Sequence, residues 1–306
     1  MTIQTMDDGD ARQYTVGLIG ADLQASLSPA LHEREGAEIG LRYAYERLDL
    51  AVLGLEPQDA GTLLGEVQRA GFAGVNVTHP CKRLVVEHLD ELSPVAGTLG
   101  AVNTIVFSDG HRRGHNTDVS GFRRGFADGL AGAALDRLVV LGAGGAGAAV
   151  AYALLSLGAR RLTVIDVDAE RADELAATLD RHFGSGRADA APVGELEARL
   201  HAAAGLAHAT PTGMGARGGV AFPADWLHDD LWVADVVYRP LATELLRAAD
   251  AAGCRTLDGG RMAVFQAAEA FELFTGARVD RRRMLRHFAT LVGEDRAETR
   301  AQAVAR

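Results

Sequence analysis

A cluster of polar side chains stands at the end of an apolar run, in the stretch GFAGVNVTHPCK from Gly71 to Lys82. The first half of this stretch is typical of a buried strand, yet Asn76, Thr78 and Lys82 follow in quick succession. An amide, a hydroxyl and an amine together can bind a polyol and exchange a proton with one of its hydroxyl groups. Lys82 is therefore the candidate proton-transfer residue, and the alternative is a lysine that extends its amine into solvent.

The residues that follow predict a helix with Lys82 near its start. Pro80 suits the first turn of a helix, and the spacing of one helical face recurs at Lys82, Val85, Leu89 and Leu92. The lysine thus lines up with buried residues. Partial burial and a nearby helix N-terminus both disfavour a charged ammonium, which suits a residue that transfers protons.

Further polar residues are expected at the ends of other strands. Asn103 lies in AVNT, and Asn116 and Asp118 lie in HNTD. Because ligands of parallel sheets bind at the carboxyl ends of the strands, one crevice can collect these amides and the carboxylate with the lysine. The alternatives are that Asn103 is a turn residue and that Asp118 caps the helix of VSGFRRGF.

The sequence VVLGAGGAG predicts a dinucleotide-binding turn between a strand and an Ala-rich helix. Gly142 permits the tight turn, Gly144 lets the backbone approach a pyrophosphate, and Gly147 permits close packing of the helix on the strand. The expected contacts come from the whole turn: Gly142, Ala143, Gly144, Gly145, Ala146 and Gly147. The alternative is a glycine-rich turn that binds no ligand.

The cofactor preference is expected to depend on Asp166, which ends the next strand, RLTVID, about 20 residues further on. A carboxylate there accepts hydrogen bonds from the ribose hydroxyls and repels a 2′-phosphate, so NAD is favoured over NADP. Two alternatives remain: Asp166 caps the following helix, or Arg171 on that helix binds a 2′-phosphate.

The elements that carry these residues alternate between strands and helices. Strands are predicted in YTVGLIG, YAYERLDL and GFAGVNV, helices in SPALHEREGAEIG and DAGTLLGEVQRA, and a hairpin at Asp109-Gly110. A second series begins near Leu138, with strands in RLVVL, RLTVID, GLAHATP and LWVADVVY. The fold class is therefore α/β, with a mostly parallel N-terminal substrate domain (residues 1–120 with 264–306) and a Rossmann dinucleotide-binding domain (residues 121–263). A late helix in RMAVFQAAEAFELFTG is expected to end at Gly276.

Composition narrows the class of protein. The 306 residues carry a net charge of −10 and are 48% hydrophobic, which is typical of a folded protein and argues against nucleic acid or an anionic membrane as partner. The basic run Asp280–Phe288 is interpreted as the solvated face of a C-terminal helix. Two cysteines in no metal-ligand spacing, no apolar leader and no long apolar segment predict a cytoplasmic chain without a metal.

Six blocks in order resemble the shikimate dehydrogenase family, including its quinate/shikimate dehydrogenase branch: SLSP, GVNVTHPCK, GAVNT, HNTD, GAGGAG and GRMAVFQ. They cover the chain from about Val16 to about Phe288. The resemblance implies that Lys82 and Asp118 form the catalytic pair. It implies that the substrate contacts are Ser26 and Ser28 at the carboxylate, Asn76, Thr78, Asn103 and Gln266 at the ring hydroxyls, and Tyr238 beside the nicotinamide. It also adds to the expected cofactor contacts Thr210, Val236 and Gly259.

Some positions depart from the commonest form of the family. The stretch DVD at 166–168 stands where NADP-linked members have an Arg after the strand, and it resembles the NAD-linked branch, as does His79. Cys81 replaces a usual aromatic residue and is interpreted as a small buried thiol. Ser28, where some quinate-using members have Thr, favours shikimate over quinate.

The resemblance implies reversible hydride transfer between shikimate and 3-dehydroshikimate, with NAD favoured over NADP as cofactor. Alternatives within the family are a quinate/shikimate or an aminoshikimate dehydrogenase, and an alternative from another class is a dinucleotide sensor without catalysis. A sensor has no need for Lys82 and Asp118 together with polyol-binding amides, which argues against it. The family also implies a monomer or homodimer with two domains around a cleft, serving aromatic amino acid biosynthesis or quinate breakdown.

Overall fold

The structure, a computed structural model, describes residues 13–215 and 217–304. These residues form two compact units. The first takes in the described residues up to Glu91, then Val102–Gly114 and the residues from Ala267 onward; the second takes in Leu92–Ala101 and His115–Gln266. The domain limits expected from the sequence stay a prediction, because compactness does not show which segments fold independently.

The first sheet contains six strands in the order β2-β1-β3-β5-β6-β4. They are β1 (Gln13–Gly20), β2 (Arg42–Asp49), β3 (Gly74–Val77), β4 (Glu91–Leu92), β5 (Thr104–Ser108) and β6 (His111–His115). β1 pairs in parallel with both β2 and β3, and β5 runs antiparallel to β3. The predicted hairpin is confirmed, since Asp109 and Gly110 both have a positive φ, of 50° and 82°.

Helices from both ends of the chain accompany this sheet. Between its strands in the sequence come α1 (Ser28–Glu38), α2 (Leu50–Leu53) and α3 (Ala60–Arg69), with 3₁₀ turns at Leu23–Ala25, Pro57–Asp59 and Val86–His88. Late in the chain follow α10 (Gly260–Thr275) and α11 (Arg281–Val304). Gly276 ends α10 with a φ of 71°, as predicted. Ala270 and Phe274 of α10 share one core with Val16 and Tyr45, so the sheet is completed by segments far apart in sequence.

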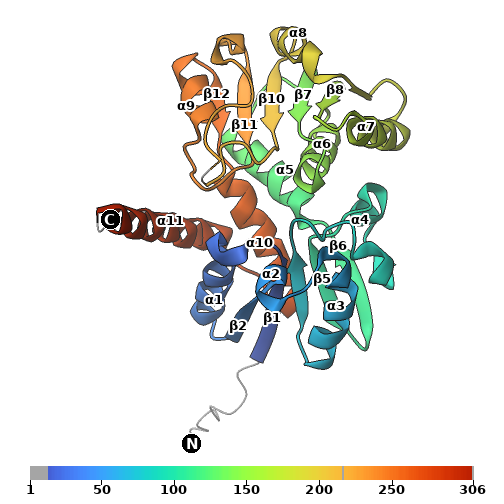
Figure 1. Cartoon of the computed structure of the whole chain (residues 1–306), viewed down its shortest axis with the longest axis vertical. Coiled ribbons are helices and arrows are strands. Elements are labelled where there is room, and N and C mark those ends of the chain that lie inside the picture. Colours follow the sequence, from blue (N-terminus) through green and yellow to red (C-terminus); the bar gives the residue numbers. More distant parts are fainter. Residues whose placement is uncertain (1–12, 216, 305–306) are drawn as a thin grey trace, which may run out of the picture. The chain divides into compact units, whose positions relative to one another are not determined.

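The second sheet is parallel, with its six strands in the order β12-β11-β10-β7-β8-β9 (Figure 1). They are β7 (Arg137–Leu141), β8 (Arg161–Ile165), β9 (Ala188–Ala190), β10 (Gly205–His208), β11 (Trp232–Asp235) and β12 (Arg255–Leu257). Its helices are α4 (Pro94–Leu99), α5 (Thr117–Gly129), α6 (Gly145–Ser156), α7 (Ala169–Phe183), α8 (Leu196–His201) and α9 (Glu244–Ala251), with 3₁₀ turns at Val193–Glu195 and Ala224–Trp226. This doubly wound order is that of a Rossmann domain, so the predicted fold class is confirmed.

The helix predicted after Pro80 is wrong. Residues 79–85 form turns, the 3₁₀ turn Val86–His88 follows, and Leu92 lies in β4. The physical reason is that the Lys82 carbonyl accepts a hydrogen bond from the Val102 amide at 2.8 Å, instead of from a helical partner four residues on. The helix whose N-terminus the sequence predicts beside Lys82 is therefore not formed by these residues.

The interpretation of the basic run on α11 as a solvated face is partly wrong. Arg283 binds Glu35 of α1 through two hydrogen bonds, of 3.0 and 2.5 Å, and the Glu35 side chain is fully buried. Arg281 binds Glu272 of α10 at 2.7 Å. A buried carboxylate needs such a partner because an unpaired charge is costly to bury. Part of the run thus fastens α11 to α1 and α10.

His32 of α1 is enclosed by aromatic side chains in the first unit. Its ring centroid lies 4.9 Å from that of Tyr45, and its Nδ1 lies 3.1 Å from the Tyr43 hydroxyl oxygen. Its Nε2 has no hydrogen-bond partner among the described residues. Burial lowers the pKa of His32 from 6.5 to about 3, so the folded protein holds this ring neutral.

The free energy of unfolding is expected to fall as the pH drops below 6.5, because the unfolded chain then protonates His32 and the folded chain does not. The contribution of the neutral ring is complete above pH 6.5, and about 2 kcal/mol of it is lost by pH 5. Urea unfolding of the wild type and of His32→Gln at pH 7.5 and 5.0 measures the effect. His111→Gln, at an exposed histidine, is the control. Equal pH dependence in all three proteins would contradict this assignment.

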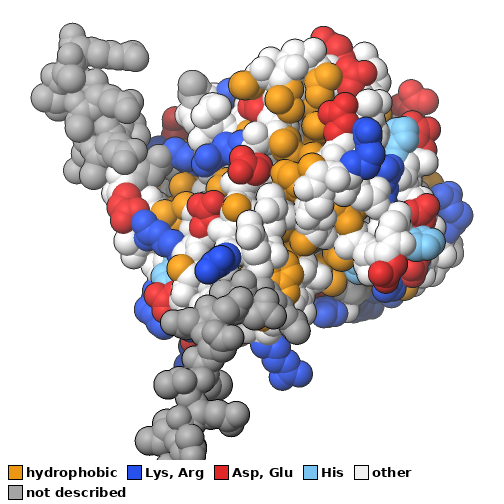
Figure 2. Space-filling view, turned by 90° about the horizontal axis from the view of Figure 1, so that it is seen from below, with side chains coloured by type: hydrophobic (Ala, Val, Ile, Leu, Met, Phe, Trp, Pro, Cys, Tyr) orange, Lys and Arg blue, Asp and Glu red, His pale blue; other side chains and the backbone are white. Residues whose placement is uncertain are grey.

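Charges of both signs are mixed on the surface. Figure 2 shows one face of the molecule, on which Lys and Arg side chains lie among Asp and Glu side chains. None of the described helices combines the length and the apolar character that a membrane span requires. Within residues 13–215 and 217–304 there is also no cluster of three or more metal-ligand side chains.

Candidate active site

The polar residues of the stretch Gly71–Lys82 follow β3 in the first unit. Asn76 lies on the strand and is 7% exposed, whereas Thr78 and Lys82 come after its end and are half-buried. Gly20, at the end of β1, permits this arrangement because a Cβ there would collide with the Thr78 side chain. The buried thiol predicted at Cys81 is confirmed, and burial raises the pKa of Cys81 to about 11.

Backbone hydrogen bonds bring residues 102 and 103 beside the end of β3. The Val102 amide donates to the Lys82 carbonyl, and the Val77 amide donates to the Asn103 carbonyl, both at 2.8 Å. Asn103 is 3% exposed and stands directly before β5. The first unit thus gathers Lys82 with two of the amides expected at the ring hydroxyls, those of Asn76 and Asn103.

Ser26 lies between β1 and α1, and Ser28 lies at the start of α1, in a segment that contacts β2. Ser28 is the first residue of α1, and its amide donates to the Ser26 hydroxyl at 3.3 Å. From β2, Arg47 donates to the Ser26 carbonyl at 3.1 Å and Asp49 accepts from the Leu23 amide at 2.8 Å. Two hydroxyls at the start of a helix are suited to a carboxylate, which agrees chemically with the expected role.

Asp118 and Gln266 belong to adjacent helices of the second unit. Asp118 is the second residue of α5 and is 6% exposed. Because α5 begins at Thr117 with Asn116 in the N-cap position, the alternative that Asp118 caps this helix is wrong. Thr117 lies 3.5 Å from Gln266 between side-chain oxygens, so the start of α5 contacts α10. Lys82 and Asp118 lie in different units, and their pairing stays a prediction.

The glycine-rich turn has the backbone that the sequence predicts. Gly142 has a φ of 110°, which favours glycine, and a Cβ at Gly147 would collide with the Gly142 carbonyl oxygen. The predicted tight turn and close packing are therefore confirmed. At Gly144, by contrast, no described atom beyond the residue itself and its two chain neighbours lies within 4 Å of the place that a Cβ would take. Since α6 begins at Gly145, its N-terminal amides adjoin this open space, as a pyrophosphate requires.

Asp166 ties the end of β8 to the glycine-rich turn. Its Oδ2 accepts a hydrogen bond from the Ala143 amide at 2.6 Å, and its Oδ1 accepts one from the Asp168 amide at 2.9 Å. Asp168 caps α7 by accepting from the Arg171 amide at 3.1 Å, so the alternative that Asp166 is the cap is wrong. The Asp168 carboxylate also pairs with the Arg171 guanidinium at 3.0 Å.

A buried hydrogen-bond network that sequence reasoning misses supports Thr210. His208 and Asp235 end β10 and β11 and pair in register, and Nδ1 of His208 lies 3.0 Å from Oδ1 of Asp235. Nε2 of His208 lies 2.6 Å from the Thr210 hydroxyl, and Asp235 accepts from the Thr243 hydroxyl at 2.7 Å. The sequence does contain a signal that could predict this network. A His and an Asp stand at the last positions of two predicted strands, and these strands are neighbours in a doubly wound sheet.

The remaining expected cofactor residues follow β11 and β12. The Val236 amide donates to the His208 carbonyl at 3.0 Å, and a Cβ at Gly259 would collide with the Val236 carbonyl oxygen. Tyr238, two residues after Val236, is half-buried. Because the six strands are parallel, these residues lie at the same edge of the sheet as Thr210 and the glycine-rich turn.

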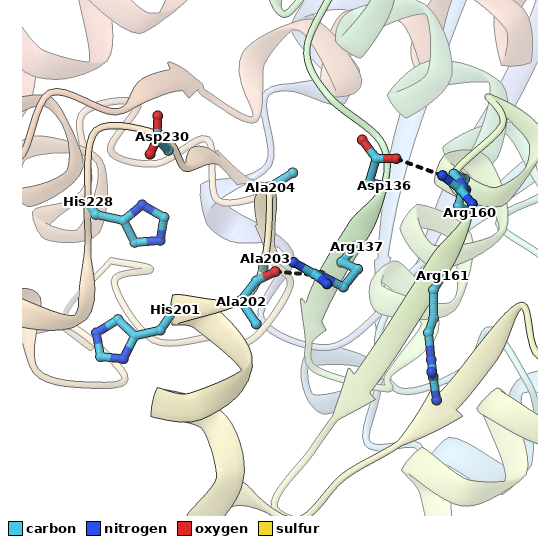
Figure 3. Close-up of a pocket in the computed structure, with 10 residues that line it drawn as sticks. All are labelled: Asp136, Arg137, Arg160, Arg161, His201, Ala202, Ala203, Ala204, His228 and Asp230. Carbon is cyan, nitrogen blue, oxygen red and sulfur yellow. Dashed lines mark hydrogen bonds and ion pairs between the residues drawn. The ribbon is translucent and has the colours of Figure 1, made fainter.

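A hollow of about 730 Å³ lies at the opposite end of the strands of this sheet, where β7 and β8 begin (Figure 3). Its arginines are already engaged with the protein: Arg137 donates to the Ala202 carbonyl at 2.7 Å, and Arg160 pairs with Asp136 at 3.4 Å. His201 and His228 lie on the other side of the hollow in Figure 3. Ligands of open parallel sheets bind at the carboxyl ends of the strands, so this hollow is not the candidate site.

Two family models match the chain. The shikimate dehydrogenase substrate binding domain matches residues 18–105, and the shikimate 5′-dehydrogenase C-terminal domain matches residues 260–287. A relative from Streptomyces avermitilis named shikimate dehydrogenase (NADP(+)) is 59% identical over 280 residues, which cover 92% of this chain and 96% of the relative. A relative from Corynebacterium glutamicum named quinate/shikimate dehydrogenase (NAD(+)) is 48% identical over 277 residues, which cover 90% of this chain and 98% of the relative.

The fold is similar to that of a solved structure, a quinate dehydrogenase from Corynebacterium glutamicum in complex with NAD. The TM-score is 0.86 and the sequence identity 46%, with 91% of this chain and 99% of that chain covered. The similarity therefore extends over both units.

Proposed function

This chain belongs to the shikimate dehydrogenase family, and from that premise we propose that it interconverts shikimate and 3-dehydroshikimate by hydride transfer, with NAD preferred over NADP. The observation that carries the proposal is the gathering of Lys82 with the amides of Asn76 and Asn103 at the end of β3. The open space at Gly144, beside the N-terminus of α6, accommodates a dinucleotide. A protein that only senses a dinucleotide has no use for Lys82 together with the amides of Asn76 and Asn103.

The division of labour follows from the chemistry of the side chains. The bound dinucleotide supplies or accepts the hydride at its nicotinamide ring. Lys82 gives a proton to the ketone oxygen of 3-dehydroshikimate and takes it from the hydroxyl of shikimate in the reverse direction. In this proposal Asp118 accepts a hydrogen bond from a neighbouring ring hydroxyl, as the catalytic partner of Lys82. Ser26 and Ser28 donate hydrogen bonds to the substrate carboxylate and fix the ring at its other end.

The preference for NAD is supported by the charges after β8. The Asp166 carboxylate lies against the glycine-rich turn, and Asp168 adds a second carboxylate two residues further on. Arg171, the nearby cation that would attract a 2′-phosphate, is engaged by Asp168. A 2′-phosphate would meet like charge there, which costs binding energy. The curated relatives include both an NADP(+) and an NAD(+) enzyme, so the argument rests on these residues of the chain itself.

Asp166→Asn is expected to lower the ratio of kcat/KM for NAD⁺ to that for NADP⁺ by about tenfold, because it removes the negative charge that opposes a 2′-phosphate. The asparagine oxygen still accepts from the Ala143 amide, so the glycine-rich turn keeps its anchor. Glu170→Gln is the control, since it removes an exposed charge from the first turn of α7. A ratio in Asp166→Asn equal to that in the control would contradict the role of Asp166.

The test of the function is kcat/KM of the purified protein for shikimate and for quinate, each with NAD⁺ and with NADP⁺. The expected result is the highest value for shikimate with NAD⁺. A higher value for quinate would replace the substrate, and a higher value with NADP⁺ would overturn the cofactor preference. Dinucleotide binding without turnover of either substrate would leave the sensor as the function.

A further inference from the structure

We propose that Tyr45 is a positioning residue that fixes which way the amides at the substrate hydroxyls donate and accept hydrogen bonds. The inference rests on the proposed function, in which Asn76 and Asn103 bind ring hydroxyls. Tyr45 lies on β2 and Asn76 on β3, with β1 between them. Two strand spacings amount to about 10 Å, so only a long side chain bridges the gap. The Tyr45 hydroxyl does so and lies 2.8 Å from Oδ1 of Asn76, with both residues buried.

The orientation of the Asn76 amide follows from one obligatory acceptor. The backbone carbonyl of Asn103 lies 3.2 Å from the Asn76 amide, and a carbonyl only accepts, so the atom that faces it is Nδ2. The Oδ1 atom therefore faces Tyr45, and the phenol hydroxyl is the donor in that bond. A phenylalanine at position 45 would keep the packing and leave a buried carbonyl oxygen without this donor, which is costly.

The same logic passes through Thr104 to the second amide. Nδ2 of Asn76 also donates to the Thr104 hydroxyl at 2.9 Å, so that oxygen is an acceptor in this bond. The Thr104 hydroxyl proton is then directed to Oδ1 of Asn103, 3.1 Å away. Each bond has one direction, from Tyr45 through Asn76 and Thr104 to Asn103.

This direction sets the polarity of the polyol site. Both N–H groups of Asn76 are used within the protein, so Asn76 meets a ligand hydroxyl only through a lone pair of Oδ1, as an acceptor. Asn103 has its Oδ1 facing Thr104, which places its Nδ2 on the other side of the amide. A ligand hydroxyl at Asn76 must therefore donate. A site of this kind discriminates against ligands that lack the matching hydroxyl. Such a ligand leaves a buried polar group of the site unpaired, which costs more binding free energy than the loss of an apolar contact.

The test compares two tyrosines that point inward from the same strand. Tyr45→Phe is expected to raise the KM and the calorimetric Kd for shikimate by about tenfold, which corresponds to the loss of one buried hydrogen bond. The KM for NAD⁺ stays within about twofold. Tyr43→Phe is the matched control, because its hydroxyl contacts Nδ1 of His32 and not an amide of the site. It is expected to leave both the KM and the Kd for shikimate unchanged.

A second pair of variants separates positioning from packing. Thr104→Val removes the hydroxyl that links the two amides and is expected to raise the KM for shikimate, whereas Thr104→Ser keeps the hydroxyl and restores it. The double variant Tyr45→Phe/Thr104→Val is expected to lose less than the sum of the single losses, because the two residues act in one network.

Three outcomes would overturn the inference. They are Tyr45→Phe binding shikimate as the wild type does, Tyr43→Phe losing as much as Tyr45→Phe, and Tyr45→Phe weakening NAD⁺ and shikimate equally. If the wild type binds shikimate but does not turn it over, the proposed function fails and the Kd comparison still decides the role of Tyr45. If the wild type binds neither shikimate nor quinate, the proposed function and the inference fail together.

Discussion

Lys82→Met is expected to lower kcat with shikimate on the order of 10²–10⁴-fold, because the protein then lacks the group that exchanges a proton with the substrate oxygen. The methionine keeps most of the length and apolar stem of the lysine, so the half-buried position stays filled. NADH binding, followed by fluorescence, is expected to persist, since the glycine-rich turn and Asp166 are unchanged.

The control for this variant is Arg83→Met, which removes one positive charge at the next, exposed residue. It is expected to leave kcat within about twofold, as surface substitutions usually do. Turnover of Lys82→Met at the wild-type rate would remove Lys82 from the mechanism. Equal losses in both variants would mean that net charge near the substrate, and not a proton at Lys82, sets the rate.

Gly147→Ala is expected to lower the free energy of unfolding by about 3 kcal/mol or more, because the new methyl group would collide with the Gly142 carbonyl oxygen. The colliding atom is a backbone oxygen and the methyl group is attached directly to the backbone of residue 147, so no flexible side chain can move to relieve the collision. Urea unfolding measures the loss, and dinucleotide binding is expected to fall with it because the turn itself is displaced.

Gly144→Ala is the matched variant in the same turn, with the opposite expected result. Its φ of −71° is accessible to alanine, and no described atom beyond the two chain neighbours lies within 4 Å of the new methyl group, so stability is expected to be unchanged. The Kd for NADH is expected to rise by about tenfold, since the methyl group stands where the pyrophosphate meets the backbone. Wild-type affinity in Gly144→Ala would contradict the place assigned to the pyrophosphate.

The sequence is informative about this fold where local chemistry and long-range packing agree. Apolar runs that end in glycine identify β1 and β7, and Asp109-Gly110 identifies its hairpin, because a turn with two positive φ angles admits few residue types. The error after Pro80 has the opposite origin. The residues there have helical spacing, but the Lys82 carbonyl is bonded to Val102, a partner that only the tertiary structure supplies.

The candidate site divides in the same way. Gly142 and Gly147 can be read from the chain because a backbone requirement leaves one residue type possible. The supports of the site cannot, since Tyr45 and Thr104 bind Asn76 through strand order and register, and His208 meets Asp235 only because β10 pairs with β11. For Asp118 and Asp166 the sequence leaves capping open, and the positions of Asn116 and Asp168 decide against it.

The division of the first unit among separate segments has a consequence for how the protein is made. Its sheet strands end by His115, but Ala270 and Phe274, which join their core, come only after Ala267. About 150 residues lie between these points, which a ribosome adding roughly 5–20 residues per second needs about 8 to 30 s to synthesise. During that interval the nascent sheet presents Val16 and Tyr45 without the α10 side chains that finally cover them. The second unit therefore has time to fold first. The earliest strands are the ones that a chaperone would need to protect.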